Sequence, residues 1–298
     1  MRRLDNIDLR LLRIYTTLVD AGSFFDAGVA LNLSQPTLST HLATLEQRLG
    51  ERLCERGRKG FRLTPFGEVT YNAAQTLFGE INRFNERVSN PASKVVDRLA
   101  VGIIDGVVTN PKLGLQAAIG EFLKTREVFI DLDLGTPREL ERAILTGERD
   151  LVIGPVAQSS PDVTYVALHR EPHALYCGKD HPFFELPAQK LSRKLLDESL
   201  FSIRGYRNFD DLYRVGHRRA SGSVNKIEAQ TMMILSGQYV GFLPCHVGDH
   251  WASMGMMKVL KHRTYAFESQ HFAAYRSADA NNRTLVAFLR AVKHYAMA

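Results

Sequence analysis

Polar side chains that could read DNA bases gather in one short stretch of the chain. A Gln side chain can make two hydrogen bonds to the edge of adenine, and Ser and Thr can bond base edges or phosphates. The stretch contains no acidic residue, so it would not repel phosphates. We expect its DNA-contacting residues to be Ser34, Gln35, Pro36, Thr37, Ser39 and Thr40.

A basic loop follows this stretch. Its cations suit phosphates or a minor groove. Two glycines permit a tight turn between short strands predicted at 52–55 and 61–64. Beside a DNA-reading helix the pattern favours a wing, although a charged hairpin that only faces solvent would look the same. The basic residues are Arg56, Arg58, Lys59 and Arg62, with Glu55 as the one acid, and we expect Arg56, Arg58 and Lys59 to contact DNA.

Three short helices would position these residues. Apolar spacing predicts one helix after Asp8 as N-cap, a second over 24–31, and a third between Ser34 as N-cap and Gly50. The third helix has an apolar stripe made of Leu38, Leu42, Leu45 and Leu49. Two helices joined by a tight turn, the second with a polar N-terminal face, are typical of a unit that enters the major groove.

A longer helix is predicted to begin at Thr64 and Pro65 and to end before a hinge at 90–93. Its narrow apolar stripe is typical of a two-stranded coiled coil, but a helix packed on its own domain gives a similar stripe. The stripe consists of Phe66, Val69, Ala73, Leu77, Ile81, Phe84 and Val88, and we expect the first six to lie in a dimer interface.

The remaining two-thirds alternates strand and helix patterns. Strands predicted at 99–104, 128–134 and 151–154, with helices at 109–124 and 136–145, imply a parallel sheet flanked by helices. A second group of strands and helices starts near Val163. Its predicted elements are strands at 174–177, 200–203, 239–243 and 270–275, a helix over 225–236 opened by Asn225 and Glu228 as a capping box, and a last helix from about 282.

Residues 8–73 resemble the N-terminal domain of the LysR-type transcriptional regulators. The resemblance rests on ordered strings: Ala21-Gly22-Ser23-Phe24, Ala30-Leu31-Asn32-Leu33-Ser34-Gln35-Pro36-Thr37-Leu38-Ser39, Leu45-Glu46-Gln47-Arg48-Leu49-Gly50-Glu51-Arg52-Leu53 and Leu63-Thr64-Pro65-Phe66-Gly67-Glu68. Three positions depart from the family pattern: Thr40, where a basic residue is frequent, Cys54, where Phe is common, and Gly28, where Ala is usual.

The C-terminal part resembles the effector domain of the same family through Gly135-Thr136 and the segments 147–153 and 237–244. The resemblance implies an α/β fold with a winged helix-turn-helix head and a two-lobed effector domain like the type 2 periplasmic binding proteins. The implied domains are 1–64 for DNA binding, 65–92 for a dimerising linker helix and 93–298 for the effector. Lobe I takes about 93–162 and 269–298, and lobe II about 163–268.

An effector in such a fold lies between the lobes, beside helix N-termini and strand ends. The candidate contacts are Asp105, Gly106, Thr109, Thr136, Ile203 and Arg204. Thr109 and Thr136 could equally cap their helices, and Arg204 could be a surface residue. Arg204 would favour an anionic effector whereas Asp105 would favour a cationic one, so the effector stays unidentified. The family implies a homodimer or homotetramer on double-stranded DNA, with RNA polymerase as a further candidate partner.

Several classes of function are disfavoured. A net charge of +6 permits a polyanionic partner. No apolar run could span a membrane and no apolar signal segment follows Met1, so we expect a cytoplasmic protein with no membrane partner. The three cysteines, Cys54, Cys177 and Cys245, are read as free thiols.

Catalytic and metal motifs give little support for other functions. The pair His246/His250 has a metal-like spacing but no evident further ligand. The pair His169/His173 has the same spacing, but Pro172 between them argues against a helix. We therefore predict no metal, no cofactor and no catalytic residues. The rival functions are an enzyme built on the two-lobed domain and a solute-binding protein.

Overall fold

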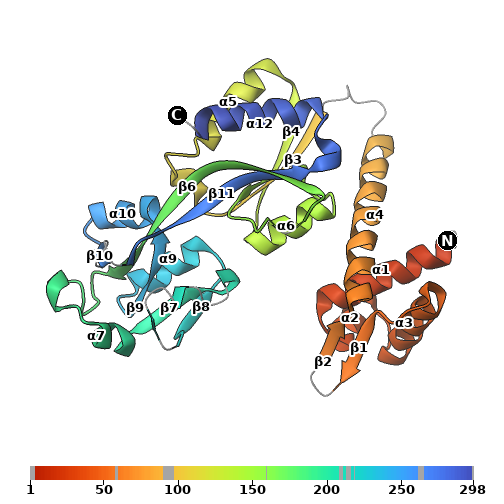
Figure 1. Ribbon diagram of the computed structural model, residues 1–298, viewed down its shortest axis with the longest axis horizontal. Helices are drawn as coiled ribbons and strands as arrows, with labels where there is room; N and C mark the ends of the chain where they lie inside the picture. Colours follow the sequence, from red (N-terminus) through yellow and green to blue (C-terminus); the bar gives the residue numbers. More distant parts are fainter. Residues whose placement is uncertain are drawn as a thin grey trace. The chain divides into compact units, whose positions relative to one another are not determined.

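The chain divides into two compact units, one of residues 1–93 with 145–148 and one of residues 94–144 with 149–298 (Figure 1). The structure is a computed structural model that describes residues 4–57, 60–89, 97–158, 160–207, 211–212, 216–217, 219–260 and 265–296. Within those residues, no helix combines the length and the hydropathy that crossing a bilayer requires.

The first unit packs three short helices, a hairpin and one long helix around a single apolar core. Leu38, Leu42 and Leu45 of the third helix are buried in that core, as their spacing predicts. The elements are α1 (Asn6–Ala21), α2 (Phe24–Leu31), α3 (Gln35–Leu49), β1 (Cys54–Gly57), β2 (Gly60–Leu63) and α4 (Pro65–Ser89).

Helix caps explain where these helices begin and end. Ser34 caps α3 and Gly50, at φ 87°, ends it, so both predictions are confirmed. The prediction that Asp8 caps the first helix is wrong. Asp5 is the N-cap: its carboxylate accepts the N–H of Asp8 at 3.0 Å, while the Asp8 carboxylate accepts the N–H of Asp5 at 3.0 Å. This reciprocal capping box starts the helix three residues earlier.

The second unit is built on one mixed sheet whose nine described strands follow the order β4-β3-β5-β11-β6-β9-β7-β8, with β10 added on β6. The strands are β3 (Asp97–Ile103), β4 (Val128–Leu134), β5 (Leu151–Gly154), β6 (Val163–Gly178), β7 (Leu200–Arg204), β8 (Gly222–Val224), β9 (Tyr239–Pro244), β10 (Met257–Leu260) and β11 (Phe267–Arg276). The helical segments that the site involves are the 3-10 turn η1 (Val107–Thr109), α5 (Leu115–Thr125), α6 (Pro137–Leu145), α9 (Ile227–Leu235), α10 (Cys245–Ser253) and α12 (Arg283–Ala296).

Two parallel groups of strands define two lobes. β3 pairs in parallel with β4 and β5, and β7 pairs in parallel with β8 and β9, which confirms the predicted parallel sheet in the first lobe. The long strands β6 and β11 pair antiparallel and run between the two groups (Figure 1). The chain therefore passes from one lobe to the other along these two strands.

Two predicted helix starts in the second unit are wrong. The helix expected from Thr109 begins at Leu115 after Gly114, because Asn110 turns the chain with its side-chain oxygen accepting the N–H of Lys112. No capping box opens α9. Its N-cap is Lys226, which makes no side-chain capping bond, and the carboxylate of Asp105 accepts the N–H of Ile227 instead. At α9 a tertiary contact therefore replaces the local cap.

Candidate nucleic-acid interface and ligand site

The N-terminal end of α3 presents its polar side chains to solvent. Gln35, Pro36 and Thr40 are exposed, whereas Thr37 and Ser39 are half-buried. The Ser34 hydroxyl accepts the N–H of Thr37 at 3.3 Å and lies 2.8 Å from the Thr37 hydroxyl. The Thr40 hydroxyl donates to the carbonyl of Pro36 at 3.0 Å. Gln35 is thus the longest exposed hydrogen-bonding side chain at this end of the helix.

The turn between α2 and α3 depends on a close approach of the backbone. A Cβ atom on Gly28 would lie 2.8 Å from the carbonyl oxygen of Leu33. The N–H of Leu33 bonds the carbonyl of Gly28 at 3.0 Å, and Asn32 between them has a positive φ of 51°. Gly28 therefore stands where Ala is usual because the turn leaves no room for a side chain.

The hairpin is held against α3 by one carboxylate. Glu46 accepts the N–H groups of Leu53 and Cys54 at 2.8 and 3.3 Å. The strands pair with Glu55 opposite Arg62, and both side chains are exposed. The two strands, at 54–57 and 60–63, lie one or two residues closer to the turn than the predicted strands at 52–55 and 61–64. Arg58 and Lys59 lie outside the described residues, and the side chain of Arg56 is not described either, so the three expected wing contacts stay predictions.

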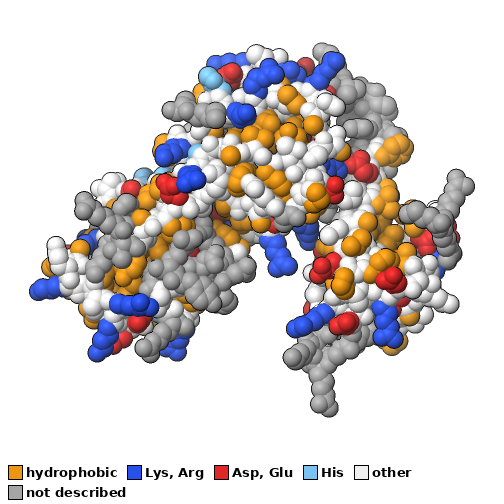
Figure 2. All heavy atoms as spheres, viewed as in Figure 1, with side chains coloured by type: hydrophobic (Ala, Val, Ile, Leu, Met, Phe, Trp, Pro, Cys, Tyr) orange, Lys and Arg blue, Asp and Glu red, His pale blue; other side chains and the backbone are white. Residues whose placement is uncertain are grey.

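The apolar stripe of α4 is divided between two surroundings. Phe66 packs on the core of its own unit, as do Ala74 and Phe78 from the neighbouring face of the helix. Val69 and Phe84, by contrast, are 65% and 64% exposed. Figure 2 shows apolar side chains along the visible face of α4. Of the other stripe residues, Ala73 is exposed, and Leu77 and Ile81 are half-buried.

The expected effector residues of the first lobe make contacts with the second lobe. Asp105 is buried and bonds the first N–H of α9, and Gly106 packs beside Ile227 with a φ of 77°. Thr109 lies 2.8 Å from Nδ1 of His246 on α10. Thr136 instead caps its own helix, where it exchanges hydrogen bonds with Glu139 at 2.7 and 3.4 Å.

Arg204 is a buried cation with spare hydrogen-bonding capacity. It is 2% exposed, and Nη1 donates to the hydroxyl of Tyr206 at 3.2 Å. Nε is 3.9 Å from the carboxylate of Asp211, and buried Nη2 has no hydrogen-bond partner among the described residues. The side chain of Ile203 packs in the core of the second lobe, so only its backbone could meet a ligand.

The sequence reasoning missed a buried carboxylate surrounded by histidines. Glu171 on β6 accepts the amide of Asn110 at 2.9 Å, and its carboxylate lies 3.1 Å from Nε2 of His246, 3.4 Å from Nε2 of His173 and 3.7 Å from Nε2 of His271. His169, Glu171 and His173 alternate along a strand, and residues two apart share a face. That period of two is the signal in the sequence that could have found the cluster.

Burial and the neighbouring imidazoles oppose each other at Glu171. Burial alone raises the pKa of this carboxyl group, but the hydrogen bond from His246 and the charges of His271 and Arg204 bring the pKa below its usual value. Burial lowers the pKa of His169, which favours a neutral ring. The two shifts thus favour an ionised Glu171 carboxylate beside a neutral His169 ring.

The described cysteines do not form a reactive pair. Cys54, Cys177 and Cys245 are free thiols, and the first two are buried. Burial raises the pKa of Cys177 to about 12 and also raises the pKa of Cys245. Since the thiolate is the reactive form, both thiols are suppressed as nucleophiles at neutral pH.

Family models cover almost the whole chain. Residues 9–68 match the bacterial regulatory helix-turn-helix proteins of the lysR family, and residues 95–296 match the LysR substrate binding domain. The transcriptional activator BauR of Pseudomonas aeruginosa is 32% identical over 296 residues, covering 97% of this chain and 96% of BauR.

Solved structures share the whole fold at low identity. A full-length OxyR variant from Pseudomonas aeruginosa aligns with a TM-score of 0.54 and 23% identity, covering 100% of this chain and 97% of that one. Full-length LysG from Corynebacterium glutamicum with bound effector Arg aligns with a TM-score of 0.52 and 18% identity, covering 97% and 98%.

Proposed function

We propose, from the premise that this chain belongs to the LysR family of bacterial helix-turn-helix transcriptional regulators, that it reads a specific DNA site with α3 and responds to a small molecule held between its two C-terminal lobes. It acts in the cytoplasm, where its DNA is, and carries out no reaction of its own. The proposed domains are residues 1–64 for DNA binding, 65–92 for the linker and 93–298 for effector binding.

The observation that carries the DNA-reading role is the exposed Gln35 at the start of α3. The helix is fixed behind it by the Ser34 cap and by the buried leucines, so Gln35 can enter a major groove with little loss of order. Contacts from shorter side chains come from Ser34, Thr37, Ser39 and Thr40, and Pro36 packs against the DNA backbone. The wing residues Arg56, Arg58 and Lys59 supply phosphate contacts that are not specific for sequence.

Replacing Gln35 tests base reading directly. The variant Gln35→Ala should lose about 1–3 kcal/mol of affinity on the specific site. It should lose much less on random DNA, where binding is mostly electrostatic. Paired titrations at one salt concentration measure both losses, and a melting curve checks the fold. Equal losses on the two DNAs would remove Gln35 from base reading and leave the helix-turn-helix in place.

A self-associating linker helix accounts for the exposed half of the α4 stripe. Val69 and Phe84 are large apolar side chains that a monomer would leave in water. β4 is an edge strand and exposes Phe129, Leu132 and Leu134, which offers a second apolar surface. Two such surfaces on one chain suit a homodimer that assembles further into a homotetramer. RNA polymerase is a proposed further partner of the DNA-bound form.

The effector site is proposed at the contacts between the lobes. Arg204 offers a buried guanidinium whose Nη2 has no hydrogen-bond partner within the part of the chain that the structure describes, which suits an anionic group on the effector. Asp105, Gly106 and Thr109 of the first lobe already lie against the second lobe, so a ligand beside them would change how the lobes meet. Thr136 and the backbone of Ile203 complete the proposed site.

A stability screen of the full chain identifies the effector. A specific ligand raises the melting temperature by mass action, and Arg204→Gln should abolish that rise for an anionic ligand. If a stabilising ligand is chemically converted during the experiment, this result supports an enzyme built on the two-lobed domain. It refutes the proposal that the chain carries out no reaction.

A further inference from the structure

Five side chains of the types that commonly ligate metals lie together at the two strands that join the lobes. His169, Glu171 and His173 come from β6, His271 from β11 and His246 from α10. His169, Glu171, His173 and His271 are each 8% exposed or less. Buried imidazoles in such number are unusual, because each must find partners away from water. Imidazole and carboxylate together are also a common ligand set of zinc and other divalent transition metals.

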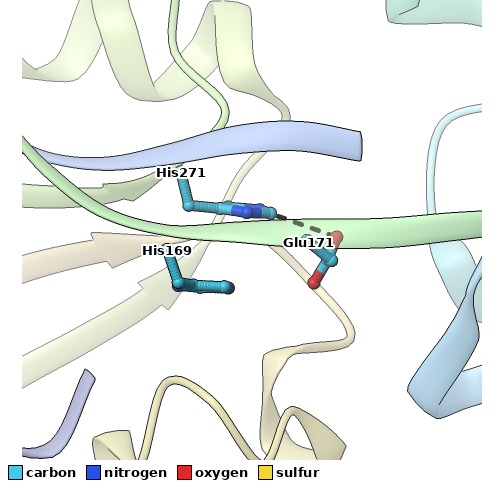
Figure 3. Close-up of side chains that lie close together, drawn as sticks. All are labelled: His169, Glu171 and His271. Carbon is cyan, nitrogen blue, oxygen red and sulfur yellow. Dashed lines mark ion pairs between the residues drawn. The ribbon is translucent and has the colours of Figure 1, made fainter. Parts of the chain in front are cut away.

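Three of these side chains bring their ligand atoms close together. The ligand atoms of His169, Glu171 and His271 all lie within 4.8 Å of one another. The rings of His169 and His271 are parallel, with centroids 4.8 Å apart and an interplanar angle of 7°. Figure 3 shows both rings extending toward the carboxylate of Glu171 from neighbouring strands. The register that pairs Gln270 with Arg170 brings His271 opposite His169, at the point where the pairing of β11 with β6 shifts before Phe272.

Outer hydrogen bonds hold the carboxylate in a useful orientation. Oε1 of Glu171 accepts the amide of Asn110 at 2.9 Å and faces Nε2 of His246 at 3.1 Å. Oε2 faces His271 at 3.7 Å. The ring of His246 is itself positioned by Thr109, 2.8 Å from its Nδ1. Partners of this kind fix the ligands of a metal and are needed for its affinity.

His173 also lies beside the carboxylate of Glu171. Nδ1 of His173 lies 3.1 Å from the carbonyl oxygen of Glu171 and must donate to it, since a carbonyl only accepts. Nε2 of the same ring lies 3.4 Å from Oε2 of Glu171. Arg204 approaches the same Nε2 at 3.5 Å, which is long for a hydrogen bond.

We propose that His169, Glu171 and His271 bind one divalent transition-metal ion, such as zinc, leaving a fourth position for water or a ligand atom. Tetrahedral ligands at about 2.1 Å from zinc lie roughly 3.4 Å apart, so the three side chains must close by about an ångström. The amide nitrogen of Asn110 lies 3.0 Å from Nε2 of His169, so that ring nitrogen must exchange this hydrogen bond for the ion, while Asn110 can keep its bond to Glu171. His246 and Asn110 act as positioning residues.

The location gives the ion a structural consequence. The ligands lie on the two strands shared by the lobes, while Asn110 and Thr109 belong to the first lobe and His246 to the second. Binding would therefore tie both lobes to one point and stabilise the second unit. This inference does not rest on the proposed regulatory function, since it concerns binding to the chain without DNA.

Metal titration of the full-length chain tests the proposal. After treatment with a chelator, the protein is titrated with Zn²⁺ by calorimetry and with Co²⁺ by visible absorption, which reports four-coordination. We expect one equivalent per chain and a higher melting temperature with Zn²⁺. His169→Gln and His271→Gln should each weaken binding by at least tenfold to a hundredfold and remove the four-coordinate Co²⁺ spectrum.

A matched control separates this cluster from surface binding. His250 is exposed on α10 and lies outside the cluster, so His250→Gln should bind both ions as the unmodified chain does. Circular dichroism verifies the fold of each variant. If the unmodified chain does not bind one equivalent of either ion, the proposal is overturned, and the cluster is held by hydrogen bonds and ion pairs without a metal. Equal affinity in His250→Gln and in the two cluster variants overturns it as well, as adventitious surface binding.

Discussion

Gly28 illustrates how a single residue is chosen by its surroundings against its intrinsic preference. In a helix, Ala is favoured over Gly by about 1 kcal/mol. Here the added Cβ would lie 2.8 Å from the backbone oxygen of Leu33, which cannot move without opening the turn. We expect Gly28→Ala to lower the free energy of unfolding of the first unit by about 1–3 kcal/mol, the usual cost of overpacking.

The matched control for this prediction is Gly120 on α5. A Cβ at Gly120 would meet nothing within 4 Å, so Gly120→Ala should be neutral or stabilising by up to about 1 kcal/mol. Calorimetry of the full chain measures both variants. Stabilisation by both substitutions would show that the turn after α2 has room for a methyl group.

Single residues also mark the limit of what the sequence could predict about the sites. Ser34 was predicted as a cap because its type and position suffice. Asn110 was misread as part of a helix start, because its amide is used by Glu171 and His169, which lie far along the chain. The histidine cluster was missed for the same reason: His246 and His271 reach it only through the folded sheet.

At the scale of elements, helix α4 should reveal whether its exposed stripe is an interface. The double variant Val69→Glu and Phe84→Glu places charge on the two most exposed apolar positions of that stripe. If copies of the chain pair there, the charges would be buried and the dimer should dissociate at micromolar concentration. Sedimentation velocity measures this. Asn72→Glu, on an exposed polar position of the same helix, should leave the assembly intact.

Strands β3 and β4 give a prediction about pH. Arg98 and Arg149 lie 2.8 and 2.9 Å from the carboxylate of Asp131, and the hydrogen bond from Arg98, with Arg149 beside it, lowers the pKa of Asp131. A pKa that is lower in the folded state than in the unfolded state stabilises the fold at pH values above the unfolded-state pKa of about 3.9. This stabilisation is lost as the pH falls through the folded-state pKa.

Replacing Asp131 checks that sign. Asp131→Asn should be less stable than the unmodified chain near pH 7, and the difference should shrink as the pH falls below about 4. Melting temperatures measured across this range give the comparison. Parallel curves for the two proteins would mean that the two arginines do not stabilise the folded carboxylate.

Elements with a strong local period were predicted with their bounds. The helix over 24–31 and the strands over 128–134 and 151–154 are found as expected. β6 was predicted only over 174–177, because the part of the strand before it ends in the polar run Arg170-Glu171-Pro172-His173. That part is stabilised by pairing with β11 rather than by an apolar pattern, and such pairing is set by the whole sheet.

At the scale of the whole molecule, electrostatics should govern affinity for all DNA sequences. Changing Arg56 and Arg58 to Ala removes two predicted phosphate contacts and should flatten the salt dependence of binding by roughly one unit of slope per contact. Removing the exposed charges of Lys124 and Arg126 in the second unit changes the net charge equally and should leave the slope unaltered. Equal slopes for both double variants would remove the wing from the interface.

The bond from Asp105 to the first N–H of α9 spans 122 positions of the chain. One lobe thus supplies the cap for a helix of the other, and both lobes share strands β6 and β11. Neither lobe can therefore be transplanted alone. A chimaera that exchanged the second lobe with that of a relative would need the recipient's residue at 105 to match the incoming helix, and two cuts through paired strands. Recombination between such regulators should succeed at the boundary before β3 and fail inside the C-terminal unit.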